Sequence, residues 1–357
     1  MSVLMHALSL GLAGPVLRPS QAGWDSSNVA NPVVLLPRPD VAGDPWRLFY
    51  YGSDGTWANP DVQPFLPTGK CGLATSADGC SWTRVQDAPI FEPGPAGSWD
   101  SLHVGVGDVH WSEDGQSLVM YYLGANDEVV TGGPPVKGIR MRIGRAISAD
   151  GGLSWTREPE PVLDCDASEG LFASWPRVLP PESTGGPWQM SYHSFDGSCW
   201  KVFSAKSDDG GQSWAREGLA IGPGGEGRFD SQGCGTRCLV RQREGVLMIY
   251  EGVEAGEGTH RLGAALSTDG GLSFSKLDEV SPLLAPGGAG GPWTAQVVGT
   301  PFAVALPGGG LRLYFCGKPT AERGGMCIGA VESASSNSGE IGTQAWRAVG
   351  GAAMADI

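Results

Sequence analysis

Acidic residues recur in this sequence as part of a repeated phrase. Its clear copies are Trp24-Asp25-Ser26, Trp99-Asp100-Ser101 and Phe229-Asp230-Ser231; at the same place the third unit has Glu169-Gly170-Leu171-Phe172 and the fifth has Trp293-Thr294. If the fold turns such carboxylates toward one point, one can protonate a leaving oxygen while another activates water. The alternative is a repeated structural corner, in which the carboxylate caps a turn and the neighbouring aromatic ring packs between sheets. We keep Asp25, Asp100 and Glu169 as catalytic candidates and Asp230 as a ligand-binding candidate, with the structural corner as the alternative.

A second series of polar residues follows each phrase, inside segments that are otherwise apolar. The segments are Asn31-Pro32-Val33-Val34, Asp108-Val109-His110-Trp111, Trp175-Pro176-Arg177-Val178, Thr236-Arg237-Cys238-Leu239 and Thr300-Pro301-Phe302-Ala303. A buried carboxylate must be paired or have a shifted pKa, and such groups concentrate at functional sites. Asp108 is therefore a catalytic candidate. The ligand-binding candidates are Asn31, Trp175, Arg177, Arg237 and His110, with internal ion pairs to Asp108 or Asp230 as the alternative role of the two arginines.

Repeated strand patterns must position these residues. Each unit has an aromatic and aliphatic run, such as Trp46–Gly52 or Val246–Gly252, followed by a small-residue strand that closes on Ser76, Ser148, Ser207, Ser267 or Ser333. A long period of alternating strands and glycine-rich turns is typical of radial β repeats, whose units bury their faces against one another. The sequence therefore predicts an all-β chain: a single five-bladed β-propeller of four-stranded antiparallel blades, at roughly 15–85, 86–158, 159–217, 218–277 and 278–350. Asp108 is expected on an innermost strand, at the ligand site.

The turn after each closing serine is also repeated. Ser148–Trp155 fits the pattern S-x-D-x-G-x-[ST]-[WF], as do Ser207–Trp214 and Ser267–Phe274. The aspartate can accept hydrogen bonds from the turn amides, and glycine supplies a positive φ. Because a group that recurs in nearly every unit usually serves the unit, we expect Asp78, Asp150, Asp209 and Asp269 to be structural.

These patterns together resemble the five-bladed glycosidase propellers: arabinanases, xylosidases, invertases, levansucrases and mannoside phosphorylases. The turn resembles the Asp-box of sialidases. The segment 108–122 is similar to the family's inner strand, whose first aspartate lies in the active site. The resemblance implies catalytic carboxylates from the first three blades, but Asn31 occupies the first of these positions and Ser174 falls near the third.

Two functions therefore stand as hypotheses. The first is a glycosidase-like enzyme that binds a neutral carbohydrate in the central funnel and cleaves it with an Asp/Glu pair. The second is a non-catalytic propeller that binds a carbohydrate or a protein partner.

The composition of the chain argues against several other classes of function. The chain has 38 acidic against 24 basic residues and no basic stripe, which argues against nucleic-acid binding. It has no apolar stretch long enough to span a membrane. Residues 1–14 lack the positive start of a signal peptide and are expected to form a first strand that pairs near Trp346. The cysteine spacing predicts no metal site, and nothing predicts a cofactor.

Replacing Asp150 by alanine tests the structural role of the repeated turn. We expect the free energy of unfolding to fall by about 1–3 kcal/mol, because turn hydrogen bonds are lost, with ligand binding not selectively changed. Thermal denaturation measures the first effect and a binding assay the second. A wild-type melting temperature together with abolished binding would contradict this role.

Overall fold

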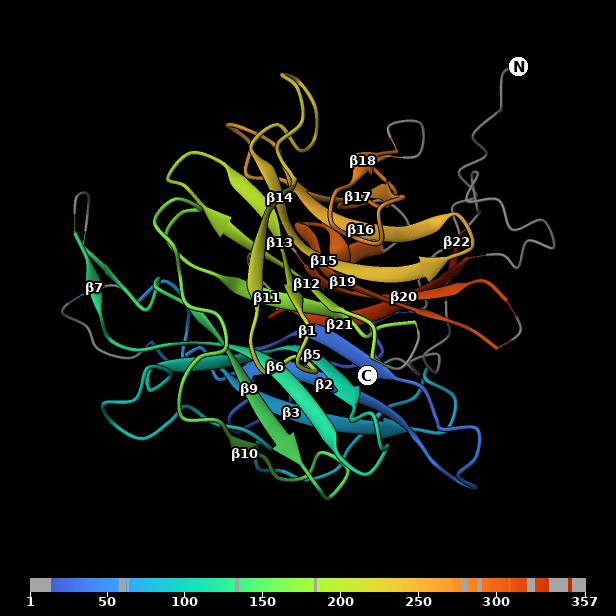
Figure 1. Cartoon of the computed structure of the whole chain (residues 1–357). Coiled ribbons are helices and arrows are strands. Elements are labelled where there is room, and N and C mark those ends of the chain that lie inside the picture. The colour runs from blue at the N-terminus through green and yellow to red at the C-terminus, as the bar shows by residue number, and fades with distance from the viewer. Residues whose placement is uncertain are drawn as a thin grey trace, which may run out of the picture.

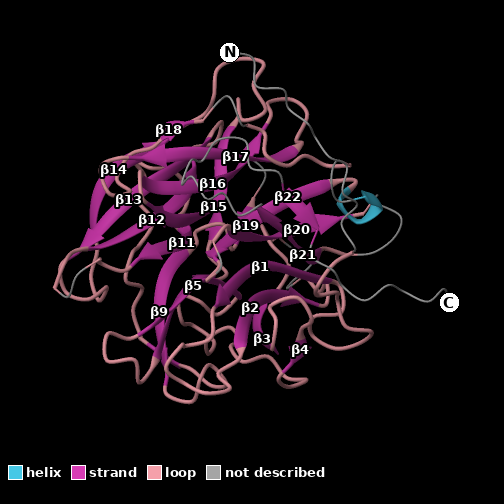
Figure 2. Cartoon of the chain, turned by 90° about the vertical axis from the view of Figure 1, so that its right-hand side faces the viewer, coloured by secondary structure: helices cyan, strands magenta, loops and turns pink. Residues whose placement is uncertain are grey.

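The computed structural model of the chain is built almost entirely of strands. It describes residues 14–57, 62, 64–131, 135–182, 185–277, 281–287, 291–307, 309–319, 325–333 and 346–348. Within them lies one 3₁₀ segment, η2 (Gly291–Thr294) (Figure 2). No helix in these residues is long and apolar enough to cross a membrane.

The strands group into antiparallel sheets. Three sheets have four strands each. The first holds β1 (Asn28–Leu35), β2 (Trp46–Ser53), β3 (Lys70–Ser76) and β4 (Thr83–Arg84), and the second holds β5 (His103–Trp111), β6 (Leu118–Ala125), β9 (Arg142–Ser148) and β10 (Thr156–Arg157). The sheet nearest the C-terminus holds β19 (Val297–Ala305), β20 (Leu311–Lys318), β21 (Cys327–Ser333) and β22 (Trp346–Ala348). An eight-stranded sheet holds β11 (Ser174–Leu179), β12 (Trp188–Phe195), β13 (Trp200–Ser207), β14 (Ala215–Ile221), β15 (Gly233–Gln242), β16 (Gly245–Val253), β17 (His260–Ser267) and β18 (Ser275–Lys276). A small hairpin, β7 (Val129–Val130) and β8 (Val136–Lys137), completes the set. The predicted all-β class with antiparallel sheets is confirmed.

The first strands of these groups meet at the centre of the molecule. β1 contacts β5, β5 contacts β11, β11 contacts β15, β15 contacts β19, and β19 contacts β1 (Figure 1). The short last strands β10 and β18 lie at the periphery of the same view. Strands enclosed on both faces should be apolar throughout, and β1 and β5 are buried over nearly their whole length. We call these five strands the inner ring.

Apolar cores fill the spaces between neighbouring sheets. Val202 of β13 packs in one cluster with Met248 of β16 and Ala265 of β17. Another cluster joins Leu48 of β2 to Tyr314 of β20. Each sheet thus buries its faces against its neighbours, as the repeat predicts.

The N-terminal part of the described chain pairs with the last sheet. The amides of Val16 and Leu17 donate to the Ile328 carbonyl in β21 (2.8 and 3.0 Å), and Ile328 donates back to the Leu17 carbonyl (2.9 Å). This pairing brings residues near the two ends of the chain into one sheet. The strand expected over residues 1–14 lies outside the described residues, except for Gly14.

The recurring acidic phrase forms a repeated corner. In each case the carboxylate accepts a hydrogen bond from a tyrosine of the second strand and pairs with a cation of the last strand. The sets are Asp25 with Tyr50 and Arg84, Asp100 with Tyr122 and Arg157, Glu169 with Tyr192 and Arg216, and Asp230 with Tyr250 and Lys276. Trp24 stacks on Tyr50 and Trp99 on Tyr122. This geometry supports the structural interpretation of the phrase over the catalytic one, because each carboxylate is committed to partners of its own sheet.

The repeated turns make the hydrogen bonds that their sequence predicts. Asp150 accepts from the amides of Leu153 and Ser154, both at 3.0 Å, and from the Ser148 hydroxyl at 2.7 Å. Burial by itself would raise the pKa of Asp150, but these bonds and that from the Ser154 hydroxyl lower it to about 2. The carboxylate is therefore ionised at neutral pH and fixes the turn.

Asp100→Asn tests the corner. Asp100 is 1% exposed and pairs with Arg157, so removing its charge should lower the free energy of unfolding by about 1.5–3 kcal/mol. The control is Glu182→Gln, which breaks the ion pair between Glu182 and Arg241. Because the Glu182 side chain is 76% exposed, this change should lower the free energy of unfolding by less than about 1 kcal/mol. Urea denaturation measures both, and equal small losses would show that the corner does not stabilise the sheet.

Candidate functional site

Every strand of the inner ring is irregular at one place. The pairing with the second strand slips between Ala30 and Val33, Val106 and Asp108, Ser174 and Arg177, Cys234 and Arg237, and Gly299 and Phe302. Such bulges re-aim side chains and are frequent beside active sites. The inner ring therefore carries a circle of bulges.

Three bulge residues have strained backbones. Asn31, Trp175 and Thr300 have φ values of 51°, 48° and 45°, and they are the non-glycine residues with positive φ in the described part of the chain. Each precedes a proline, which ordinarily favours an extended backbone. Strain of about 1–3 kcal/mol per residue persists only where the surroundings impose it, and it clusters at functional sites. The strain thus marks this circle as the candidate site.

Hydrogen bonds tie three neighbouring bulges together. The amide of Asn31 donates to Thr300 Oγ1 (3.3 Å), and the amide of Thr300 donates to Thr236 Oγ1 (3.1 Å). The Thr236 hydroxyl donates in turn to Glu251 Oε2, which also accepts from the Thr300 amide at 2.9 Å. The chain of bonds runs across β1, β19 and β15 and ends on a carboxylate of β16.

Glu251 and His260 form a charged pair beside these bulges. His260 Nδ1 contacts Glu251 Oε1, and the side chains are 36% and 11% exposed. Gly299 leaves room for the carboxylate, since a Cβ there would lie 2.9 Å from it. Burial by itself would raise the pKa of Glu251, but His260, Thr236 and the Thr300 amide lower it. Burial would lower the pKa of His260, but Glu251 raises it above its ordinary value. The pair is therefore an imidazolium and a carboxylate in weakly acidic solution.

Trp175 rests on a buried polar assembly. Its ring stacks on His193 of β12 with centroids 5.0 Å apart and planes 10° apart. Arg237 Nη1 contacts His193 Nδ1 (2.9 Å), and Arg237 Nη2 donates to the carbonyl of Trp175. Trp175 is half-buried, and its indole N–H lacks a hydrogen-bond partner within the described structure. The guanidinium of Arg237 thus holds the strained backbone of Trp175 directly and its indole ring through His193.

Asp108 lies on the inner ring, as expected, but is closed in. Its Oδ1 accepts from its neighbour Val109 (2.9 Å), and its Oδ2 accepts from Val178 of β11 (2.8 Å) and lies 3.5 Å from His110 Nε2. Asp108 is 4% exposed. Burial by itself would raise its pKa, but His110, Arg177 and the Val178 amide lower it. Asp108 is therefore ionised at neutral pH and cross-links β5 and β11.

The predicted candidates separate into three places. Asn31, Trp175 and Arg237 lie at bulges of three inner strands, and of these Trp175 and Arg237 are in contact. Asp108, His110 and Arg177 form a buried set between β5 and β11. Asp25, Asp100, Glu169 and Asp230 occupy corners of their own sheets.

Five residues of this region were not predicted: Thr236, Glu251, His260, Thr300 and His193. Thr236 and Thr300 begin two of the polar inner segments. Glu251 interrupts the apolar run of its unit, which was the available signal.

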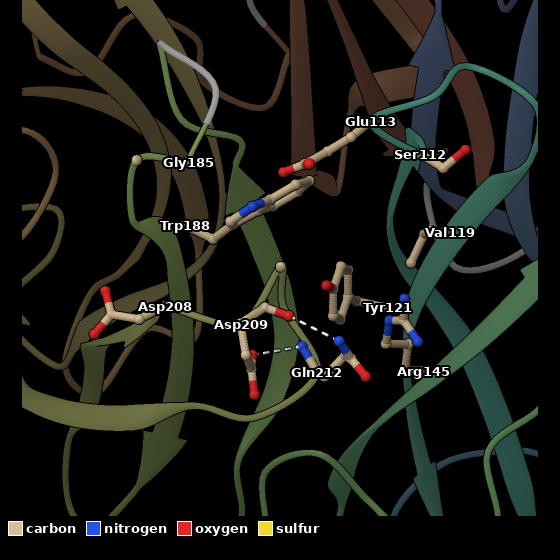
Figure 3. Close-up of a pocket in the computed structure, with 12 residues that line it drawn as sticks. Ser112, Glu113, Val119, Tyr121, Arg145, Gly185, Trp188, Asp208, Asp209 and Gln212 are labelled. Carbon is tan, nitrogen blue, oxygen red and sulfur yellow. Dashed lines mark hydrogen bonds between the residues drawn. The ribbon is translucent and has the colours of Figure 1, made fainter.

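A pocket of about 410 Å³ lies elsewhere, between the sheet of β5, β6, β9 and β10 and the β11–β14 part of the eight-stranded sheet. It is lined by Ser112, Glu113, Val119, Tyr121, Arg145, Gly185, Gly186, Trp188, Asp208, Asp209, Gly210 and Gln212 (Figure 3). These residues belong to the turns after β5 and β13, the segment before β12, and the strands β6, β9 and β12. Glu251 and His260 lie instead at the end of β16 and the start of β17. Because first and second strands are antiparallel, the pocket lies at the opposite end of the sheets. Trp188 therefore provides a control site for Trp175.

No protein-family model matches the chain, and no curated protein does. Solved structures are similar over most of its length. A member of the GH130 family, described as mannoside phosphorylases containing glycoside hydrolases that target β-1,2 mannosidic linkages in Candida mannan, is 20% identical with a TM-score of 0.61, over 92% of this chain and 96% of that one. A thermostable family-43 glycoside hydrolase is 13% identical with a TM-score of 0.64, over 95% and 98%. A GH32 β-fructofuranosidase of Bombyx mori is 13% identical with a TM-score of 0.62, over 96% and 67%. At these identities the likeness establishes a propeller-type fold.

Titration of the histidines tests the electrostatics of the site. Burial lowers the pKa of His103 to about 4, and burial with the charge of Arg237 holds the pKa of His193 well below its ordinary value. His260 is expected to titrate above 6.5, and Glu251→Gln should lower its pKa because the carboxylate partner is lost. NMR spectra of the imidazole rings, recorded against pH, separate these cases. A His260 signal that titrates with those of the buried histidines would disprove the pair.

Proposed function

We propose that this protein is a single-domain, five-bladed propeller that binds a carbohydrate at the centre of its inner ring, on the side of Trp175. Counting five blades treats β11–β14 and β15–β18 as separate units, because one parallel bridge, Trp200 with Gly233, joins them. We propose blade boundaries near 85, 158, 221 and 277, because β14 (Ala215–Ile221) extends the third blade past the expected 217. Every blade then contributes its first strand to the ring.

The observation that carries this proposal is the fixed ring of Trp175. A half-buried indole, stacked on His193 and anchored through its carbonyl to Arg237, offers a rigid apolar surface, while its N–H is buried. Sugar rings have apolar faces and many hydroxyl groups, so they fit an aromatic surface surrounded by a few polar groups. Asn31 and Thr300, at other bulges of the same inner ring, carry such groups, and His260 is linked to Thr300 through Glu251. The similar solved structures carry names of enzymes that act on glycosides, which favours the same ligand class.

Hydrolysis by a conventional carboxylate pair has less support. Asn31 is an amide, Ser174 is 0% exposed with its hydroxyl directed at the Met141 sulfur (3.4 Å), and the oxygens of Asp108 are occupied. Asp25, Asp100 and Glu169 are engaged in corners. Two accessible carboxyl groups across a bond are what that mechanism requires. Binding is therefore the function that the geometry supports best.

A glycan array, followed by calorimetry on the best ligand, tests the proposal. Trp175→Ala should weaken binding by about tenfold or more, because the stacking surface is lost. The matched control, Trp188→Ala, removes a tryptophan at the far pocket and should leave the affinity unchanged; circular dichroism verifies that both variants fold. Binding that survives Trp175→Ala but not Trp188→Ala would move the site to the pocket.

Aryl glycosides test the alternative of hydrolysis. We expect no turnover that depends on Asp108, because each of its oxygens accepts a backbone amide and the residue is 4% exposed. Hydrolysis by the wild-type protein that disappears in a folded Asp108→Asn variant would restore the catalytic hypothesis.

A further inference from the structure

The centre of this acidic protein contains an excess of buried positive charge. Arg237 is 0% exposed, and burial and the charge of Arg177 lower its pKa well below its ordinary value. A guanidinium has five N–H groups and stays protonated in proteins even so. Each of its nitrogens is engaged by uncharged acceptors. The acceptors are Ser191 Oγ for Nε, His193 Nδ1 and the Gly235 carbonyl for Nη1, and the carbonyls of Trp175 and Ser191 for Nη2. No direct carboxylate contact is among these five, so the charge is solvated by dipoles.

A second buried guanidinium lies next to it. Arg177 is 3% exposed and donates to the carbonyls of Gly107 and Arg237, the latter at 2.6 Å. Asp108 is the carboxylate whose charge acts on both arginines. Two cations therefore share one anion, whereas each repeated corner matches its carboxylate with at least one cation.

The Glu251–His260 pair presents its positive end outward. The oxygens of Glu251 are covered by Thr236, the Thr300 amide and His260, and the residue is 8% exposed. The His260 side chain is 36% exposed and uses Nδ1 for Glu251, which leaves its other ring nitrogen, Nε2, to act as a donor. A ligand that reaches this pair meets an N–H group rather than a carboxylate.

We propose that the bound carbohydrate carries a carboxylate, as a hexuronate does, and that His260 donates a hydrogen bond to it while the sugar ring stacks on Trp175. This inference rests on the proposed function and replaces the expectation of a neutral ligand. The excess charge of Arg177 and Arg237 favours an anion at the ring centre, against a net charge of −14 for the chain. His260 is then a specificity-determining residue of the site.

The proposal requires a defined pH dependence. His260 is a cation below its pKa, so binding of an acidic sugar weakens as the pH rises through that value. Glu251 is the charged group that faces His260 from β16. Arg261, the next residue on β17, is paired with Glu254, and Lys276 on β18 is paired with Asp230. The expected transition therefore belongs to His260.

Calorimetry and NMR with two matched probes test the proposal: a uronic-acid trisaccharide and the hexose trisaccharide of the same linkage. At about pH 5 the acidic probe should bind roughly tenfold more tightly, which one charge-assisted hydrogen bond supplies. The preference should vanish at about pH 9 and in His260→Gln. Arg243→Gln removes a cation from the exposed turn after β15, at the other end of the sheets, and should retain the preference.

The outcomes separate the two proposals. Equal binding of both probes, lost in Trp175→Ala, overturns the charge preference and leaves carbohydrate binding intact. Binding of neither probe, with no shift of the His260 ring signals, overturns the inference; a glycan array that is also silent overturns the proposed function as well. If sodium acetate shifts the His260 signals as much as the acidic probe at equal concentration, the site takes the carboxylate alone and the sugar part is wrong.

Discussion

The buried guanidinium of Arg237 is the interaction around which the centre of the molecule is organised. A charge removed from water must have every donor satisfied, and Arg237 meets this requirement with groups from β11, β12 and its own strand. The same bonds fix the strained backbone of Trp175 and the ring of His193 beneath it. Truncating a buried ionic group usually lowers the free energy of unfolding by more than its hydrogen bonds contribute, because its partners are left unsatisfied. One side chain thus couples strand packing to the geometry of the candidate site.

Charge is distributed differently at the periphery and at the centre. In the corners each carboxylate meets a tyrosine and a cation, so Asp25 and Asp100 are locally neutralised. At the centre, dipoles take the place of counter-charges around Arg237. The periphery therefore stabilises the sheets, while the centre retains a field that a ligand can use.

Backbone strain separates the same two regions. The repeated turns place glycine where φ is positive, as at Gly152, and so avoid strain. The bulges place Asn31, Trp175 and Thr300 there instead and accept its cost. Close packing enforces part of this arrangement: a Cβ on Gly107 would lie 2.4 Å from Pro176 of the neighbouring strand.

The sequence by itself determined the all-β class, the repeated sheets and the hydrogen-bonded turns, because strand alternation and turn chemistry are local and recur in every unit. It also placed Asp108 on an inner strand. It did not show that the carboxylate is buried and ionised, since the Val178 amide that donates to it comes from β11. Only the tertiary structure favoured structural corners over catalytic carboxylates. That choice depends on Tyr122 and Arg157, which lie far along the chain from Asp100. The Glu251–His260 pair could likewise not be predicted from the sequence, because Glu251 is linked to the inner ring by the amide of Thr300, which belongs to another sheet. Period and residue type reveal what repeats, whereas the site is built from positions at which the repeats differ and meet.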